Sequence, residues 1–100
     1  MDLAELTDEL RKQAARNVKL GYRVKFVIDD GVIFWDGTDT PPEIGNEDKG
    51  EADTTIAITA ENLEKLMKGG LDPTLAYMTG KLKVEGKMGV ALKLTSMFAD

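Results

Sequence analysis

The chain has 100 residues with neither cysteine nor histidine, and its 18 acidic and 13 basic residues give a formal net charge of -5. That charge argues against a nucleic-acid partner, because contacts to phosphate backbones need clustered lysine and arginine. The missing cysteine excludes disulfides and thiol catalysis, and the missing histidine removes the commonest general base and metal ligand.

This length predicts a single domain over residues 1–100 with one hydrophobic core. No segment approaches the ~20 apolar residues of a membrane span, and the first residues lack the basic and apolar regions of a signal peptide. The last residues, Met97 to Asp100, are not a peroxisomal Ser-Lys-Leu address. We therefore expect a cytoplasmic protein without cofactor, metal or integral membrane contact.

The first predicted element is a helix over residues 2–16. Asp2 and Glu5 have the spacing of a capping box, and residues 17–21 supply the stop. The other face mixes both signs of charge, which favours a surface helix packed on a sheet over a membrane-docking helix. Its apolar stripe repeats at helical spacing and consists of Leu3, Leu6, Leu10 and Ala14.

A β-hairpin follows, with strands over residues 22–28 and 32–35 and a turn at Asp30-Gly31, a typical two-residue hairpin turn. This turn pairs Ile28 with Ile33 and Phe26 with Trp35. Directly opposed residues share a face. One face is therefore apolar and consists of Tyr22, Val24, Phe26, Ile28, Ile33 and Trp35, and the other consists of Arg23, Lys25, Val27 and Phe34.

Residues 36–53 are rich in acids, glycine and proline and predict an exposed connection. Their acids match no EF-hand spacing, which favours a solvated loop over a calcium site. A strand over residues 54–58 then precedes a helix that Thr59 caps and Gly69 ends. The inner stripe of this helix consists of Leu63, Leu66 and Met67.

The last third begins with a short helix that Asp72 caps and Pro73 starts. A lysine-fringed strand over residues 81–85 suits the edge of a sheet, with Leu82 and Val84 turned inward. The closing helix, over residues 88–98, carries Lys93 as its single charge. A helix apolar over most of its circumference needs cover on more than one side.

The order of residues in this last third resembles the sterol carrier protein 2 lipid-binding domain family. The matching positions are Asp72-Pro73, Tyr77-Met78, Gly80-Lys81-Leu82-Lys83-Val84, Gly86, Met88-Gly89 and Ala91-Leu92-Lys93-Leu94. Ala52 to Thr59, followed by Glu61-Asn62-Leu63, is similar to the family's central strand and helix, so the resemblance covers roughly residues 22–98. Lys87 departs from the pattern, because the family more often has Asn or Asp there.

The resemblance implies an α+β fold with a mainly antiparallel sheet of the five-stranded type and helices on one face. These enclose a hydrophobic tunnel that the last helix lids. It also implies a non-enzymatic carrier for fatty acyl chains, phospholipids, sterols or isoprenoid lipids. The expected lining is Phe26, Ile28, Ile33, Trp35, Ile56, Ile58, Leu66, Met67, Met78, Leu82, Met88, Leu92 and Met97. Tyr77 and Lys87 are candidates for the lipid head, with ordinary structural or solvated positions as the alternative.

Two other classes of function stay open beside the lipid carrier. The apolar closing helix also suits a protein-interaction or dimerisation module that has no cavity. An enzyme would have to rely on carboxylates, tyrosine and lysine, and the acids lie mostly in the predicted loop rather than on rigid strands. The partner expected for the carrier is a hydrophobic lipid. Transient contact with a membrane surface and the oligomeric state, a monomer or a weak dimer, stay open.

Overall fold

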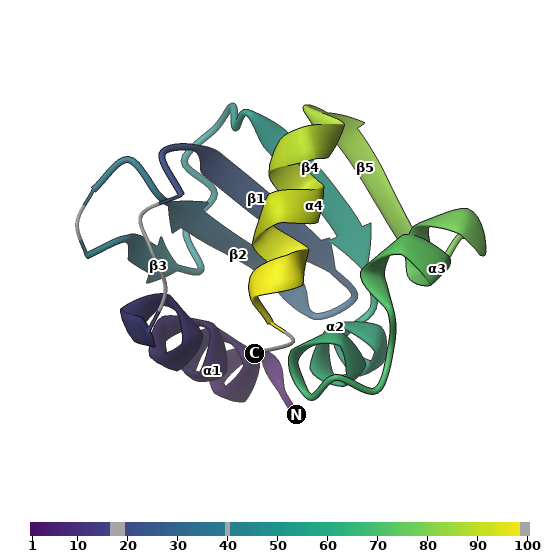
Figure 1. Ribbon diagram of the computed structural model, residues 1–100. Helices are drawn as coiled ribbons and strands as arrows, with labels where there is room; N and C mark the ends of the chain where they lie inside the picture. Colours follow the sequence, from purple (N-terminus) through teal and green to yellow (C-terminus); the bar gives the residue numbers. More distant parts are fainter. Residues whose placement is uncertain (17–19, 40, 99–100) are drawn as a thin grey trace.

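The computed structural model describes residues 1–16, 20–39 and 41–98, and these form an α+β fold of four helices and a five-stranded sheet (Figure 1). The elements in chain order are α1 (Leu3–Arg16), β1 (Arg23–Ile28), β2 (Gly31–Asp36), β3 (Glu43–Gly45), β4 (Thr54–Ile58), α2 (Ala60–Met67), α3 (Pro73–Met78), β5 (Leu82–Gly86) and α4 (Met88–Met97). The predicted stop of the first helix falls partly on residues 17–19, outside the described residues.

The strand order is β3-β2-β1-β4-β5, and the sheet is mixed. Neighbouring strands are antiparallel except for the central pair, β1 and β4, which is parallel. The α+β class and the five strands are confirmed, while the antiparallel description holds only away from this central pair. Between β1 and β4 the chain passes through β2, β3 and the following loop. This path brings it back to the end of the sheet where β1 starts, so β4 runs parallel to β1.

The helices bring their apolar residues to one face of this sheet. In Figure 1, α4 crosses in front of the sheet, while α1 and α2 lie along its lower side. The core joins Leu10 of α1, Leu66 of α2, Ala76 of α3 and Leu94 of α4 to the strand residues of that face. This layer between sheet and helices is the centre of the fold.

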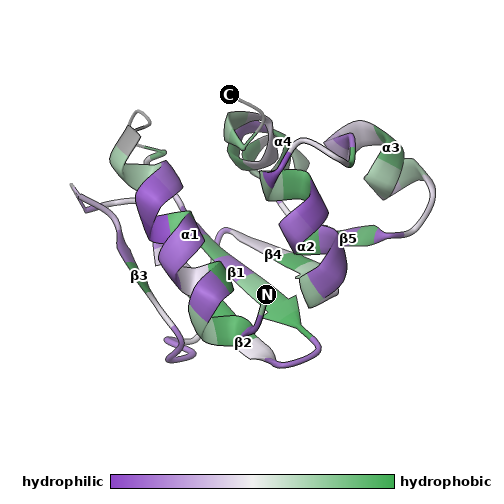
Figure 2. Cartoon of the chain, turned by 90° about the horizontal axis from the view of Figure 1, so that it is seen from below, coloured by the Kyte–Doolittle hydropathy of each residue, from purple (hydrophilic) through white to green (hydrophobic). Residues whose placement is uncertain are grey.

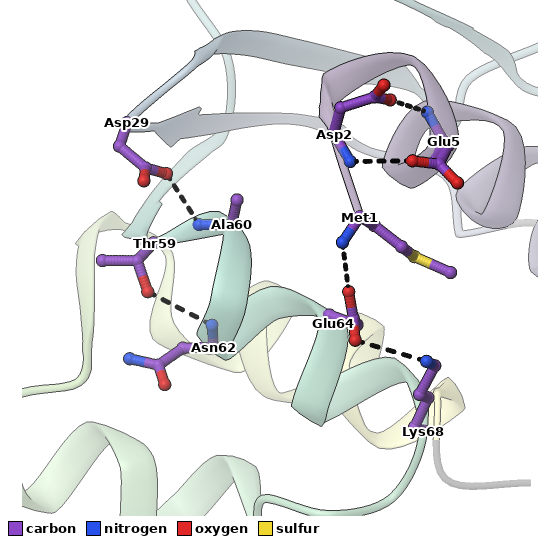
Figure 3. Close-up of polar contacts among 9 residues, drawn as sticks. All are labelled: Met1, Asp2, Glu5, Asp29, Thr59, Ala60, Asn62, Glu64 and Lys68. Carbon is purple, nitrogen blue, oxygen red and sulfur yellow. Dashed lines mark hydrogen bonds and ion pairs between the residues drawn. The ribbon is translucent and has the colours of Figure 1, made fainter.

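The two faces of the hairpin are as predicted, but the predicted pairing register of its strands is wrong by two residues. The loop is Asp29-Asp30 rather than Asp30-Gly31, so Phe26 pairs with Ile33. An even shift preserves which side chains share a face, because the strand period is two. The Asp29 carboxylate explains the shift: it accepts a hydrogen bond from the Ala60 N–H at 2.7 Å, at the start of α2 (Figure 3). That contact holds Asp29 in the loop.

The acidic segment is not wholly an exposed connection, because it supplies the edge strand β3. Ile44 of β3 enters the core. The segment also lies over Phe34 on the sheet face opposite the helices, and Phe34 is only 3% exposed. Within the ranges that the structure covers, no group of three or more acids gathers as a cation site. Sequence reasoning missed β3 because three residues carry too little periodicity to distinguish a strand from a loop.

The predicted helix starts agree with the structure. Asp2 and Glu5 form a reciprocal capping box, and the Thr59 side chain accepts from the Asn62 N–H (Figure 3). Asp72 caps α3, with Pro73 in its first turn. Local capping chemistry depends on residues a few positions apart, so a single sequence carries it.

The closing helix meets its prediction only in part. One side of α4, with Val90, Ala91 and Leu94, is buried, while Leu92 on the opposite side is 38% exposed. Within the described part of the chain, the Lys87 side chain makes no capping hydrogen bond at the start of α4. The prediction that this helix is covered on more than one side is therefore wrong for the side that carries Leu92.

Candidate functional site

Most of the predicted lining residues lie together between the sheet and the helices. Alternate residues of β1, β2 and β4 point to this side, and the inner stripe of α2 meets them there. β5 adds one more residue at the edge. We call this set the apolar layer. Each of its residues is at most 7% exposed, and they are Phe26, Ile28, Ile33, Trp35, Ile56, Ile58, Leu66, Met67 and Leu82.

The four other predicted lining residues lie outside the apolar layer. Met88 and Met97 of α4 are half-buried, and Met97 packs against the core. Met78 is 74% exposed, because the short helix α3 buries Ala76 and turns Met78 outward. Leu92 lies on the outer side of α4. A contact between these residues and a ligand stays a prediction.

The exposed apolar side chains concentrate on α3 and α4. Four of the six large apolar residues that are exposed in the described part of the chain are Leu75, Tyr77, Met78 and Leu92. We call these four the α3–α4 apolar surface, and Figure 2 shows hydrophobic colour on both helices. Tyr77, a predicted head-group contact, belongs to this surface. α3 and α4 are in contact, and exposed apolar side chains on neighbouring helices are candidates for an interaction surface.

A groove of about 320 Å³ lies along the other flank of α4. It is lined by Tyr22, Lys87, Gly89, Val90 and Lys93. The Lys87 ammonium lies 5.3 Å from the centroid of the Tyr22 ring, which is within reach of a cation–π interaction. Lys87, the other predicted head-group contact, therefore lies in a groove beside the apolar layer, together with a second cation.

Trp35 has a polar atom that the sequence reasoning overlooked. The residue is 2% exposed, and no described residue accepts a hydrogen bond from its indole Nε1–H. From the sequence, Trp35 is expected to be an apolar contact. The overlooked signal was chemical: a tryptophan buried inside an apolar face brings a donor that needs a partner.

The shifted carboxylates of the described residues are all stabilised as anions. A hydrogen bond from the Thr38 hydroxyl lowers the pKa of Asp36, and one from the Gly50 N–H lowers the pKa of Asp48. The amino group of the chain lowers the pKa of Glu64 (Figure 3). A general acid at neutral pH needs the opposite shift. These three groups are therefore suited to structural contacts rather than to proton transfer.

The comparisons identify the family. The model of the SCP-2 sterol transfer family matches residues 3–99, and the chain belongs to this family. Over residues 1–16, 20–39 and 41–98, no helix is long and apolar enough to cross a membrane.

Two curated relatives are proteins much longer than this chain. Hydroxysteroid dehydrogenase-like protein 2 of Homo sapiens is 36% identical over 70 residues, which are 69% of this chain and 17% of that protein. Sterol carrier protein 2 of Oryctolagus cuniculus is 46% identical over 52 residues, which are 52% of this chain and 9% of that protein. The chain thus spans less than a fifth of either relative.

A solved structure shows the same fold over the full chain. The solution structure of palmitated SCP2L2 from Aedes aegypti superimposes with a TM-score of 0.74 and 15% sequence identity. It covers 100% of this chain and 96% of the other. The arrangement of sheet and helices is therefore a known one.

Proposed function

We propose that this chain is a non-enzymatic carrier that holds a fatty acyl chain, phospholipid, sterol or isoprenoid lipid in its apolar layer. Membership of the SCP-2 sterol transfer family over residues 3–99 is the observation that carries the proposal. The apolar layer supports it, because it offers a continuous hydrocarbon-like surface with half-buried Met88 and Met97 at its border. Methionine adapts to ligands of different shape.

Ligand entry requires a movable element, since the residues of the apolar layer pack closely. α4 suits this role because it is a short helix of ten residues. Among the described residues, no side chain caps its start by a hydrogen bond. A ligand chain that lifts α4 would occupy a tunnel between this helix and the sheet. We therefore propose α4 as the lid.

The energetics favour transfer over storage. Each buried methylene contributes about 0.8 kcal/mol, so about ten to fourteen methylenes contribute roughly 8 to 11 kcal/mol. Losses of translational, rotational and chain freedom take back at least ~4 kcal/mol. The remaining free energy of at most roughly 4 to 7 kcal/mol corresponds to dissociation constants between about 1 mM and about 10 μM.

The non-enzymatic assignment rests on the residues available. Histidine and cysteine are absent from the chain, and the shifted carboxylates have lowered pKa values. In a longer protein such as the human relative, a domain of this kind would present lipid to a neighbouring catalytic unit. We expect the carrier to work as a monomer or weak dimer in the cytoplasm, with at most transient contact to a membrane surface.

A second candidate function has a specific observation in its favour. The α3–α4 apolar surface leaves Met78 and Leu92 exposed, as expected for a protein-interaction or dimerisation module. In that case the apolar layer would serve only as a core.

Native mass spectrometry of the purified protein, followed by organic extraction, separates the two functions. A bound mass of a few hundred daltons that extraction recovers is expected for the carrier. A lipid-free dimer would contradict the carrier and support the interaction module. A lipid-free monomer would be titrated with laurate, a phospholipid, a sterol and an isoprenoid lipid, and failure to bind all four would overturn the carrier.

A matched pair of variants tests where the lipid lies. We expect Met88→Glu, at the border of the apolar layer, to reduce lipid uptake by about tenfold, because it places a charge beside the hydrocarbon. Met78→Glu changes a side chain that is already exposed and should leave uptake unchanged. The reverse pattern would move the ligand from the apolar layer to the α3–α4 apolar surface.

A further inference from the structure

The two edges of the sheet are protected to different degrees. β3 has three residues, and the carbonyl oxygen of its central residue, Ile44, accepts hydrogen bonds from Arg11 of α1. β5 has five residues and is the last strand in the order β3-β2-β1-β4-β5. In Figure 1 it borders the sheet, with α3 beside its start. An edge strand of this kind is a template for pairing with another strand.

The backbone of β5 directs hydrogen-bonding groups outward at alternate residues. The strand pairs with β4 antiparallel, and Val84 lies opposite Ile56. The Lys87 N–H donates to the Asp53 carbonyl oxygen at 3.2 Å, so that pair is hydrogen-bonded. Because bonded and non-bonded pairs alternate along an antiparallel ladder, the N–H and C=O of Val84, three positions earlier, point away from β4. No described strand lies on that side of β5.

The side chains of β5 carry one charge of each sign on the sheet face opposite the helices. Leu82 is in the core and Val84 packs partly against it, so Lys83 and Glu85 point to the other face. Both are exposed, and neither takes part in an ion pair among the described residues. Lysine on an edge normally opposes pairing. With Glu85 two residues further on, the strand becomes complementary to its own sequence in the reverse direction.

We propose that β5 pairs with β5 of a second copy of this chain, antiparallel and about a two-fold axis at Val84. The Val84 residues of the two copies exchange backbone hydrogen bonds. Lys83 of each copy lies opposite Glu85 of the other, and opposite charges in such cross-strand pairs are stabilising. A two-fold interface is closed, so the product is a dimer rather than a fibre.

The charges select this register. A shift of the second copy by two residues places Lys83 opposite Lys83 in one direction and Glu85 opposite Glu85 in the other. Like charges directly opposite each other destabilise a sheet. A shift by one residue brings the outward backbone groups of one copy against residues whose groups point inward. Within β5, only the register centred on Val84 satisfies both the backbone and the side chains.

The same pairing gives α3 a neighbour. Opposed residues share a face, so the helix layers of the two copies lie on the same side of the joined sheet. The start of β5 lies opposite the end of β5 of the second copy, where α4 of that copy begins. α3 contacts β5 and carries the exposed Tyr77 and Met78, and it is therefore brought towards the second copy. The interface combines strand pairing with apolar contacts.

Sedimentation equilibrium from micromolar to millimolar concentration tests the dimer. The unaltered protein is expected to show a monomer–dimer equilibrium. Glu85→Lys and Lys83→Glu each place like charges opposite each other and should weaken the dimer by about tenfold. Lys12→Glu makes the same charge change at an exposed position of α1 and should stay within about twofold of the unaltered protein. An unaltered protein that is still monomeric at millimolar concentration would overturn the proposal.

Exchanging the two charges tests the register. The double variant Lys83→Glu with Glu85→Lys should dimerise like the unaltered protein, because each acid again faces a lysine. An equimolar mixture of the two single variants should form a mixed dimer, which native mass spectrometry identifies when one variant is ¹⁵N-labelled. An interface elsewhere, such as the α3–α4 apolar surface, gives neither result. A dimer that is insensitive to the single variants, or that the exchange does not restore, would contradict the proposed pairing.

Amide hydrogen exchange tests the backbone contact independently of charge. The Val84 N–H should exchange about tenfold more slowly at millimolar than at micromolar concentration, because pairing removes it from water. The Asp30 amide, in the hairpin loop, is the control and should keep its rate. An unchanged rate at Val84 would overturn the β5 interface. The inference is independent of lipid carriage: lipid recovered from a permanent monomer would contradict this interface alone, and a lipid-free protein that meets these tests would contradict the carrier alone.

Discussion

The two flanks of the sheet are held in different ways. At the β3 edge, the Arg11 guanidinium donates to the Ile44 carbonyl oxygen at 3.0 and 2.7 Å. The Asn46 amide nitrogen donates to the Thr7 hydroxyl at 3.0 Å and to the Val32 carbonyl oxygen at 2.9 Å. Side chains of α1 and the β3 region thus connect three elements that are distant in the sequence.

At the β5 edge, the corresponding helices depend mainly on apolar contacts. The Thr54 hydroxyl donates to the Lys87 carbonyl oxygen at 2.7 Å, just before α4. Beyond this contact, α3 and α4 expose Leu75, Met78 and Leu92. Apolar contacts are not directional and tolerate displacement, whereas hydrogen bonds require fixed geometry. This contrast supports the proposal that the α1 flank is a fixed scaffold and that α4 is the lid.

The largest effect is expected from a matched pair of core substitutions. Leu10 in α1 and Leu94 in α4 are both fully buried. Leu10→Ala should lower the free energy of unfolding by about 4 kcal/mol, because the fixed scaffold cannot close the cavity. Leu94→Ala should lower it by about 2 to 3 kcal/mol, because α4 can collapse into the space. Denaturant unfolding measures both, and the reverse order would contradict the movable α4.

A medium effect is expected from the contact between α1 and β3. Arg11→Met removes the donors to the Ile44 carbonyl oxygen and should destabilise the protein by about 1 kcal/mol. Lys12→Met, on an exposed position of the same helix, should stay within about 0.5 kcal/mol of the unaltered protein. Thermal unfolding of the two variants provides the comparison. Equal stabilities would show that Arg11 does not fix this flank.

A smaller effect is expected on the pH dependence of the melting temperature. The Thr38 hydroxyl, then the Thr38 N–H and Arg23, hold the pKa of Asp36 below its ordinary value of 3.8 in the folded state. This stabilisation is fully present above pH 3.8 and is lost as the pH falls through the lower folded pKa. Asp36→Asn should therefore lower the melting temperature near pH 6 and flatten its decline below pH 4. An unchanged acid limb would show that Asp36 does not contribute to it.

The smallest effect on stability is expected on the α3–α4 apolar surface. Leu92→Ser should change the free energy of unfolding by no more than about 0.5 kcal/mol, because the side chain is already 38% exposed. If this surface mediates self-association, the same variant lowers the average mass in sedimentation at high concentration. A destabilisation of about 2 kcal/mol would instead mean that Leu92 packs inside the fold.

The sequence by itself determined the elements whose signals are local. The capping box of Asp2 and Glu5, the caps at Thr59 and Asp72, and the apolar face with Phe26 and Ile33 all follow from residues a few positions apart. The family resemblance also predicted the α+β class, since a motif over residues 72–94 carries the order of its helices and strand.

Only the tertiary structure decided the features that depend on distant partners. The hairpin register depends on the contact of Asp29 with Ala60, and β3 exists because β2 pairs with it. The outward position of Met78 follows from which residue of α3 the core accepts. The orphan donor of Trp35 is a property of the assembled fold as well, because only the finished packing shows which groups lack an acceptor. Long-range contacts of this kind leave no periodic signal in the chain, so their outcome appears only when the whole molecule is assembled.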